Sequence, residues 1–180
     1  MSDQPVPSNP PLFAPWRMAY IRGLASSPKP AAHGDECFLC GASDAATDDD
    51  RRQRLVLWQS PHAVVLLNRF PYTNGHLMVA PRTHKAELEE LDDEELLDLQ
   101  KQTAQAVRLL KRAVSAQGFN IGINVGRCAG AGVPGHLHQH VVPRWAGDIN
   151  FMHVVGETRI VPEAMSQMFK ELARVRDAGF

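Results

Sequence analysis

Three histidines occupy alternate positions in the segment His136-Leu137-His138-Gln139-His140. Side chains at every second position of a β-strand project toward one face, so this spacing gathers three imidazoles. Near neutral pH, imidazole can act as a nucleophile, an acid, a base or a metal ligand. The row therefore predicts either nucleophilic catalysis, with the outer rings in support, or a tri-histidine metal site. A purely structural role is the third interpretation, and it would require a polar partner for each buried ring.

A glycine-rich loop leads directly into the histidine row. Its glycines are Gly126, Gly130, Gly132 and Gly135. Because glycine lacks a Cβ atom, such a loop can bring backbone N–H groups close to phosphate oxygens. We therefore expect Gly130 and Gly132 to contact a phosphate group. The alternative is a flexible connector, which the position directly before the histidines makes less attractive.

The cysteines indicate metal binding. Cys37 and Cys40 form a Cys-x-x-Cys pair, whereas the third cysteine, Cys128, has no partner by spacing. An odd number of cysteines with this pairing suits metal binding in a reducing compartment better than a disulfide framework. Two thiolates and two imidazoles would complete a tetrahedral zinc site. The alternative is two buried cysteines without metal.

Composition limits the classes of partner. The chain has 180 residues, of which 44% are hydrophobic, which is enough for a buried core and excludes disorder throughout. Its 19 basic and 20 acidic residues are interspersed and give a net charge of −1, so we expect no nucleic-acid partner. No run of about 18 apolar residues is present, and the N-terminus is polar, so we expect a cytoplasmic protein without a membrane partner. A small anionic ligand remains compatible with this balance.

Short apolar runs predict the strands of an antiparallel sheet. They cover residues 54–58, 63–68, 76–80, 119–125 and 136–142. The stretch 71–75, Pro-Tyr-Thr-Asn-Gly, has the composition of a turn. It predicts that the second and third strands are antiparallel neighbours.

Two helices are expected to pack on this sheet. Asp92 and Glu95 have the spacing of a capping box, apolar residues then recur at helical intervals, and Gly118 supplies a stop. The second helix is expected within 162–178. The predicted class is α+β, with a central antiparallel sheet of about five strands, a long helix and a C-terminal helix.

The chain is expected to hold one domain with two flanking segments. Residues 1–15 are rich in proline and predict a flexible arm. The domain is expected over 16–157, followed by a C-terminal helical extension over 158–180. Within the domain, the stretch from Cys40 to Arg54 has an acidic triplet beside a basic cluster and no hydrophobic period, which predicts a solvated loop.

The histidine row resembles the signature of the histidine triad (HIT) family, His-φ-His-φ-His-φ-φ with φ apolar. Gln139 departs from this signature. The resemblance extends through 67–81 and 118–126 and covers about residues 16–157. The flanking segments 15–21 and 142–151 are similar to the bacterial diadenosine tetraphosphate phosphorylase-like and HIT hydrolase branch.

The resemblance implies a sheet that continues across a homodimer and a site for a nucleoside 5′-phosphate. It implies that His138 is the nucleophile and that His140 contacts the phosphate or the leaving group, with His136 as the third member of the catalytic row. Asn68 matches a ribose-contacting position, although it could simply cap a strand. His76 would lie beside the site. Asn124 matches a phosphate-contacting residue, although it could instead make a turn hydrogen bond.

A related branch, the galactose-1-phosphate uridylyltransferases, supplies a second resemblance. There, a Cys-x-x-Cys pair, a histidine in a Pro-x-x-His segment and the first histidine of the triad bind structural zinc. The matching residues here are Cys37, Cys40, His84 and His136. The cofactor implied is therefore structural zinc, and the alternative is an exposed His84 beside buried cysteines.

The function implied is that of a hydrolase or nucleotidyltransferase. It would cleave dinucleoside polyphosphates, or nucleoside 5′-phosphate derivatives, at the α-phosphate through a nucleotidyl-histidine intermediate. In several relatives a glutamine or serine shortly before the triad binds the phosphate, whereas residues 129–135 here offer no such side chain. Backbone N–H groups could take its place, or the leaving group is handled differently. The alternatives are a catalytically weak nucleotide-binding regulatory module and a tri-histidine metallohydrolase.

Overall fold

The computed structural model of the chain describes residues 37–148 and 164–179. The predicted proline-rich arm over 1–15 and the predicted domain boundaries near residues 16 and 157 lie outside these ranges. Among the described helices, none is both long and apolar enough to cross a membrane.

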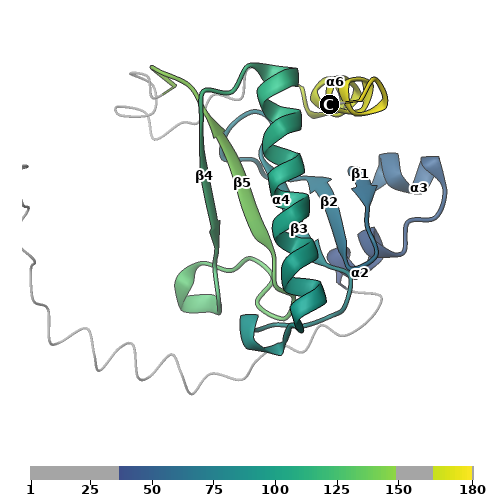
Figure 1. The fold of residues 1–180 in the computed structure, drawn as a ribbon, viewed down its shortest axis with the longest axis vertical. Helices are drawn as coiled ribbons and strands as arrows, with labels where there is room; N and C mark the ends of the chain where they lie inside the picture. The colour runs from purple at the N-terminus through teal and green to yellow at the C-terminus, as the bar shows by residue number, and fades with distance from the viewer. Residues whose placement is uncertain (1–36, 149–163, 180) are drawn as a thin grey trace, which may run out of the picture. The chain divides into compact units, whose positions relative to one another are not determined.

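A five-stranded antiparallel sheet forms the centre of the structure, which confirms the predicted class (Figure 1). The strands are β1 (Val56–Gln59), β2 (Ala63–Leu67), β3 (Leu77–Pro81), β4 (Gly118–Ile123) and β5 (Gln139–Arg144). Their order in the sheet is β1-β2-β3-β5-β4, and each neighbouring pair is antiparallel. This order places β3 beside β5. The start of β3, which follows the predicted turn, therefore lies next to the histidine row.

One strand begins later than predicted. We expected a strand over 136–142, but β5 begins at Gln139. The extended segment before β5 bonds elsewhere: the N–H of Leu137 donates to the carbonyl of Lys85 at 2.7 Å, and the N–H of His136 donates to the carbonyl of Val133. Only the last histidine of the row therefore lies within the sheet.

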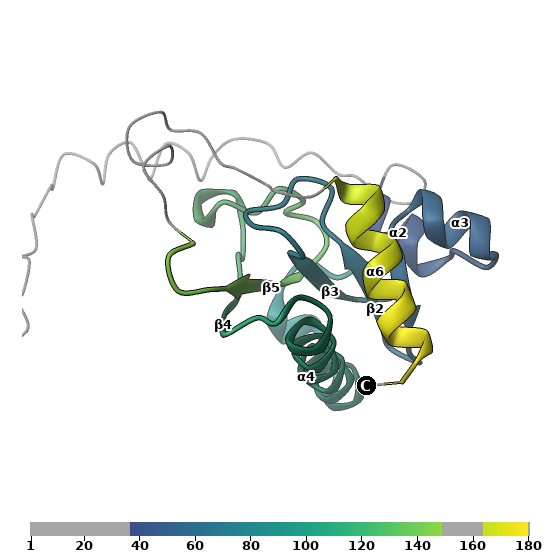
Figure 2. The same ribbon diagram turned by 90° about the horizontal axis from the view of Figure 1, so that it is seen from above.

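Two long helices cover the same face of the sheet (Figure 2). Helix α4 (Asp93–Val114) begins at the predicted capping box, in which Asp92 and Glu95 each bond the other's backbone N–H. It ends before the predicted stop, because Ser115 adopts a left-handed conformation with φ of 51°. Helix α6 (Met165–Asp177) lies within the predicted range 162–178 and packs on α4 and β1.

Apolar side chains pack on both faces of the sheet, which explains the unbroken apolar run of β2. Val65 and Leu67 face the core under α4 and α6, whereas Val64 and Leu66 face a second core. This second core is closed by helix α2 (Phe38–Ser43). It includes Met78, which pairs directly with His140 across the β3–β5 ladder.

The predicted solvated loop after Cys40 is partly wrong. The structure has α2 and a second short helix there, α3 (Asp48–Gln53). A capping box between Thr47 and Asp50 starts α3. Helix α3 buries no side chain, so the predicted solvent exposure holds for α3. It does not hold for Ala42, Ser43 and Ala45, which are buried, and the predicted absence of regular structure was wrong. Two short 3-10 helices, η2 (Leu88–Glu90) and η3 (Arg127–Ala129), complete the described elements.

Candidate functional site

The histidine row meets a fourth histidine, His76, which directly precedes β3. The ring centroids of His138 and His140 are 5.0 Å apart in an edge-to-face arrangement, and those of His76 and His140 are 5.1 Å apart. His76 is fully buried and the side chain of His138 is nearly so. Pairing of β3 with β5 brings these residues together, although 64 positions in the sequence separate His76 from His140.

Hydrogen bonding fixes which nitrogen of His138 is free. Its Nδ1 lies 2.9 Å from the backbone carbonyl oxygen of His136. A carbonyl oxygen only accepts hydrogen bonds, so Nδ1 carries the proton and donates it. Neutral His138 therefore keeps the lone pair of its Nε2, which is the form that a nucleophile needs.

A chain of hydrogen bonds through His76 fixes which nitrogen of His140 carries the proton. The backbone N–H of Tyr72 donates to Nδ1 of His76 at 3.1 Å, so the proton of His76 is on Nε2. That Nε2 lies 3.0 Å from Nδ1 of His140 and donates to it. Burial, together with the nearby His140 and His138 rings, lowers the pKa of His76 to about 3, so the ring is neutral at physiological pH. The Nε2–H of His140 is then a hydrogen-bond donor beside the free nitrogen of His138.

Two residues of the loop between β2 and β3 hold His76 in place. Nδ2 of Asn68 lies 3.3 Å from Nδ1 of His76, and its Oδ1 accepts from the N–H of Phe70 at 2.9 Å. The ring of Tyr72 stacks on His76 with centroids 4.8 Å apart. The structure thus places Asn68 against His76, while its contact with ribose stays a prediction. Sequence reasoning missed Tyr72, whose only signal was its position in the turn before His76.

The departure from the His-φ-His-φ-His signature at Gln139 has a structural reason. Gln139 points to the opposite face of the sheet from the neighbouring histidines and is 3% exposed. Its Nε2 donates to Oγ1 of Thr103 at 3.1 Å, and its Oε1 accepts from Gln100 at 3.0 Å, both on α4. The amide therefore has polar partners in the core, and the substitution leaves the histidine face unchanged.

The glycine loop connects β4 to the segment that carries His136 and His138 (Figure 1). Gly130 has φ of +91°, a conformation that side chains rarely adopt, and a Cβ built there would lie 4.0 Å from Nδ2 of Asn124. Asn124 and Gly130 are therefore neighbours, whereas a Cβ at Gly132 would meet open space. Within the ranges that the structure covers, no hydrogen bond links these three residues to the histidines, and their contact with phosphate stays a prediction.

A cavity of about 440 Å³ adjoins Asn68. Its apolar lining includes Phe38, Leu55, Leu66, Phe70 and Met78, and Arg54 and Arg69 also line it. Phe70 is 82% exposed, so its ring is accessible to a ligand in this cavity. Sequence reasoning missed this cavity, because its walls come from α2, the residues before β1, the end of β2 and the loop after it, and β3, which meet only in the fold.

The predicted metal ligands form a second cluster. The ligand atoms of Cys37, Cys40, His84 and His136 all lie within 4.8 Å of one another. Nδ1 of His136 lies 3.4 Å from Sγ of Cys37, and Nδ1 of His84 lies 3.1 Å from Sγ of Cys40. Zinc bonds of about 2.3 Å to sulfur and about 2.0 Å to nitrogen place tetrahedral ligand atoms about 3.3–3.8 Å apart. The donor set and its spacing therefore fit a tetrahedral zinc ion.

One histidine of this cluster, His136, is oriented for metal binding. Nε2 of His136 donates to the carbonyl of Pro81 at 2.8 Å, which leaves the lone pair of Nδ1 toward the cysteines. Burial lowers the pKa of His136 to about 4, which keeps the ring neutral. Burial and the bond with Cys37 raise the pKa of the Cys40 thiol to about 11. A bound metal would therefore displace a proton from this thiol. Cys128 is exposed and lies outside the cluster.

Comparison with known proteins agrees with this geometry. A family model described as HIT domain matches residues 51–147. An AP-4-A phosphorylase from Mycobacterium tuberculosis is 34% identical over 162 residues, which cover 90% of this chain and 82% of that protein. A bis(5'-nucleosyl)-tetraphosphatase (asymmetrical) from Schizosaccharomyces pombe is 32% identical over 95 residues, covering 53% of this chain and 52% of that protein.

Solved structures show the same fold. A Zn-bound histidine triad family protein from Mycobacterium smegmatis superposes with a TM-score of 0.58 at 27% identity, covering 69% of this chain and 84% of that one. The NitFhit protein of C. elegans superposes with a TM-score of 0.55 at 30% identity, covering 68% of this chain and 26% of that one. Fold, motif and sequence similarity lead to one conclusion: the chain belongs to the HIT domain family.

Proposed function

We propose that this protein cleaves dinucleoside polyphosphates, or nucleoside 5′-phosphate derivatives, at the α-phosphate through a nucleotidyl intermediate on His138. One observation carries the proposal: the rings of His138 and His140 are neighbours, and they present different nitrogens. Nε2 of neutral His138 keeps its lone pair, whereas Nε2 of His140 carries a proton and can donate. The similarity to proteins named AP-4-A phosphorylase and bis(5'-nucleosyl)-tetraphosphatase supports the substrate class.

The reaction would have two steps. Nε2 of His138 attacks the phosphorus joined to the nucleoside, a P–N bond forms, and the bond to the leaving phosphate breaks with its electron pair. The Nε2–H of His140 donates a hydrogen bond to the phosphate or the leaving oxygen as negative charge develops there. In the second step, water or inorganic phosphate attacks the nucleotidyl group and restores the free lone pair of His138.

The nucleoside would occupy the cavity beside Asn68. The apolar side chains of this cavity suit a base, and the neighbouring Asn68 amide suits a ribose hydroxyl. Asn124 and the backbone N–H groups at Gly130 and Gly132 would contact the phosphate oxygens. Residues 129–135 offer no amide or hydroxyl side chain, so backbone donors would carry this part of the site.

We further propose one structural zinc per chain at the cluster of Cys37, Cys40, His84 and His136. When bound, the ion supplies four bonds that tie α2 to the chain after β3 and to the start of the histidine row. It has no part in the reaction steps above. A Cys-x-x-Cys pair that lies in a metal-type cluster rather than in a disulfide framework also supports our expectation of a cytoplasmic location.

The products of diadenosine tetraphosphate cleavage test the proposed reaction. We expect cleavage, and comparison of incubations with and without inorganic phosphate identifies the acceptor by chromatography. ADP and ATP that form only with phosphate indicate phosphorolysis, whereas AMP and ATP indicate hydrolysis. Tight binding without any product would contradict the proposal and would favour the nucleotide-binding regulatory module.

A homodimer is expected through β4, the outermost strand next to β5. Among the described residues, none pairs with its outer edge, and Ile121 on it is 48% exposed. An uncovered edge strand with an apolar side chain favours pairing with a second copy. Light scattering at micromolar concentration should give twice the chain mass. Ile121→Glu should give the monomer, while Leu97→Glu, at a somewhat more exposed position on α4, should stay dimeric. A monomeric unmodified protein would contradict this prediction.

A further inference from the structure

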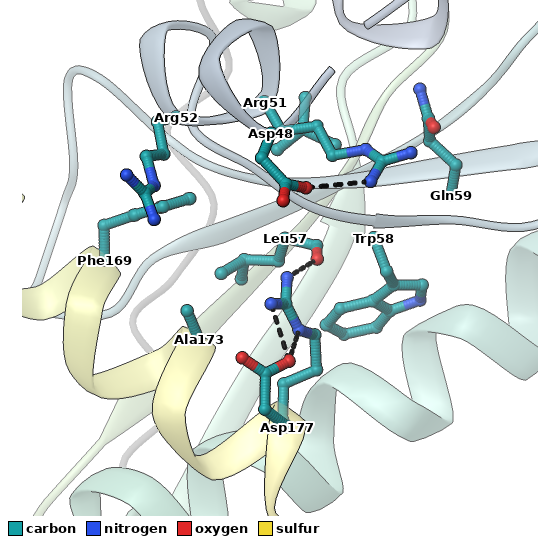
Figure 3. Close-up of a pocket in the computed structure, with 11 residues that line it drawn as sticks. Asp48, Arg51, Arg52, Leu57, Trp58, Gln59, Phe169, Ala173 and Asp177 are labelled. Atoms are coloured by element: carbon teal, nitrogen blue, oxygen red, sulfur yellow. Dashed lines mark hydrogen bonds and ion pairs between the residues drawn. The ribbon is translucent and has the colours of Figure 1, made fainter. Parts of the chain in front are cut away.

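A groove runs between α3 and α6 along the outer edge of β1 (Figure 3). Its cavity measures about 430 Å³ and shares Arg52, Phe169, Ala173 and Asp177 with a second cavity of about 480 Å³. We call these two cavities together the α3–α6 groove. It shares only Leu55 with the cavity beside Asn68 and includes none of the histidines.

The α3–α6 groove concentrates positive charge in a chain whose net charge is −1. Its basic side chains are Arg51, Arg52, Lys170, Arg174 and Arg176. Its acidic side chains are Asp48 and Asp177. Arg174 is also paired with Glu171 at 2.6 Å. Five basic groups against these three acidic groups leave an excess of two positive charges. This local field favours an anionic ligand.

Two of these cations are available to a ligand. Arg51 pairs with Asp48 at 3.3 Å, and Arg176 pairs with Asp177 and donates to the carbonyl of Leu57. For Arg52 and Lys170, by contrast, no side-chain hydrogen bond or ion pair occurs among residues 37–148 and 164–179. Arg52 reaches from α3 toward Phe169 of α6, directly before Lys170 (Figure 3). The two free cations therefore flank one stretch of the groove.

The floor of the groove is apolar and partly aromatic. Leu57, Trp58, Phe169 and Ala173 line it. Nε1 of Trp58 donates to Oε1 of Gln102 at 2.8 Å, which anchors the indole at the floor of the groove. Aromatic faces next to guanidinium groups suit a planar ring, on which both can stack.

We propose that the α3–α6 groove binds a nucleoside phosphate at a site separate from the histidines. Guanidinium and ammonium groups hydrogen-bond phosphate oxygens, so Arg52 and Lys170 receive the phosphates. The base lies against the aromatic floor. The cavity volumes are within the range of about 300–1,000 Å³ that small-molecule sites occupy. An acidic peptide would satisfy the cations but would make no specific use of the Phe169 ring, which lines both cavities together with Arg52.

Equilibrium dialysis with radiolabelled ADP tests this proposal by counting sites. Full-length protein carrying His138→Ala serves as the reference, so that turnover does not consume the probe. Adding Arg52→Glu and Lys170→Glu should lower the number of ADP molecules bound per chain by one. Adding Lys101→Glu and Arg108→Glu, two exposed cations on α4 with the same charge change, should leave the number unchanged.

The difference in bound ADP decides the outcome, whether or not the histidine site also binds the probe. An equal number in the reference and the groove variant would overturn the proposal, as would the same loss in the α4 control. Inorganic triphosphate should displace the groove-bound ADP only at a concentration at least tenfold above that of unlabelled ADP. Equal potency, or equal binding of adenosine, would overturn the assignment of a nucleoside phosphate.

Discussion

His138→Ala is expected to lower the turnover of diadenosine tetraphosphate by several orders of magnitude, because it removes the nitrogen that we propose attacks phosphorus. His140→Ala should cost about 10²- to 10⁴-fold, the range of one proton-transfer or hydrogen-bonding partner. Initial rates with saturating substrate measure both effects. Substrate binding should largely survive in each variant, because the base and ribose contacts lie elsewhere.

A matched control separates this loss from general damage to the fold. His62 is a partly exposed histidine that pairs with Glu94 3.5 Å away, outside the site. His62→Ala should turn over substrate at the unmodified rate. Circular dichroism and melting temperature should show that His138→Ala is folded. Substantial turnover by folded His138→Ala would rule out the proposed nucleophile.

Loss of the metal cluster is expected to have the largest effect on stability. Cys37 is 2% exposed, and with Leu39 it belongs to the core under α2, so the cluster anchors that helix. Cys37→Ser should lose the zinc. A loss of about 4 kcal/mol, a size that removal of a bound metal can reach, lowers the melting temperature by about 8–16 °C in a domain of this length. Elemental analysis and thermal unfolding measure the two effects.

The exposed cysteine supplies the control for the metal prediction. Cys128→Ser removes a thiol outside the cluster, so zinc content and melting temperature should both stay unchanged. Purified unmodified protein without zinc would refute the metal assignment. So would Cys37→Ser with the same zinc content and melting temperature as the unmodified protein.

Local sequence signals were sufficient to predict most of the fold. The capping box at Asp92 and Glu95 was visible because it joins residues three positions apart, and it starts α4 as expected. The apolar runs gave the five strands to within a few residues. The start of β5 was misplaced because the segment at Leu137 bonds to the backbone of Lys85, a contact that no local pattern indicates.

The site was predictable in part. Alternation placed His138 and His140 side by side, but the cluster of Cys37 with His136, 99 positions apart, followed from resemblance and not from spacing. Tyr72 and the cavity beside Asn68 were missed, because both depend on how separate strands meet. The α3–α6 groove was missed for the same reason, since its walls are distant in sequence.

Covalent labelling of His138 is the most direct test of the proposed mechanism. Protein mixed with diadenosine tetraphosphate is denatured within the first turnover at alkaline pH, because P–N bonds hydrolyse in acid, and is then digested and fragmented in a mass spectrometer. Trypsin releases residues 128–144 with all three histidines, so fragmentation must assign the modified ring. We predict an added adenylyl group on His138, absent from His138→Ala. An adenylyl group on His136, His140 or any other residue, or turnover without a covalent adduct, would contradict the mechanism.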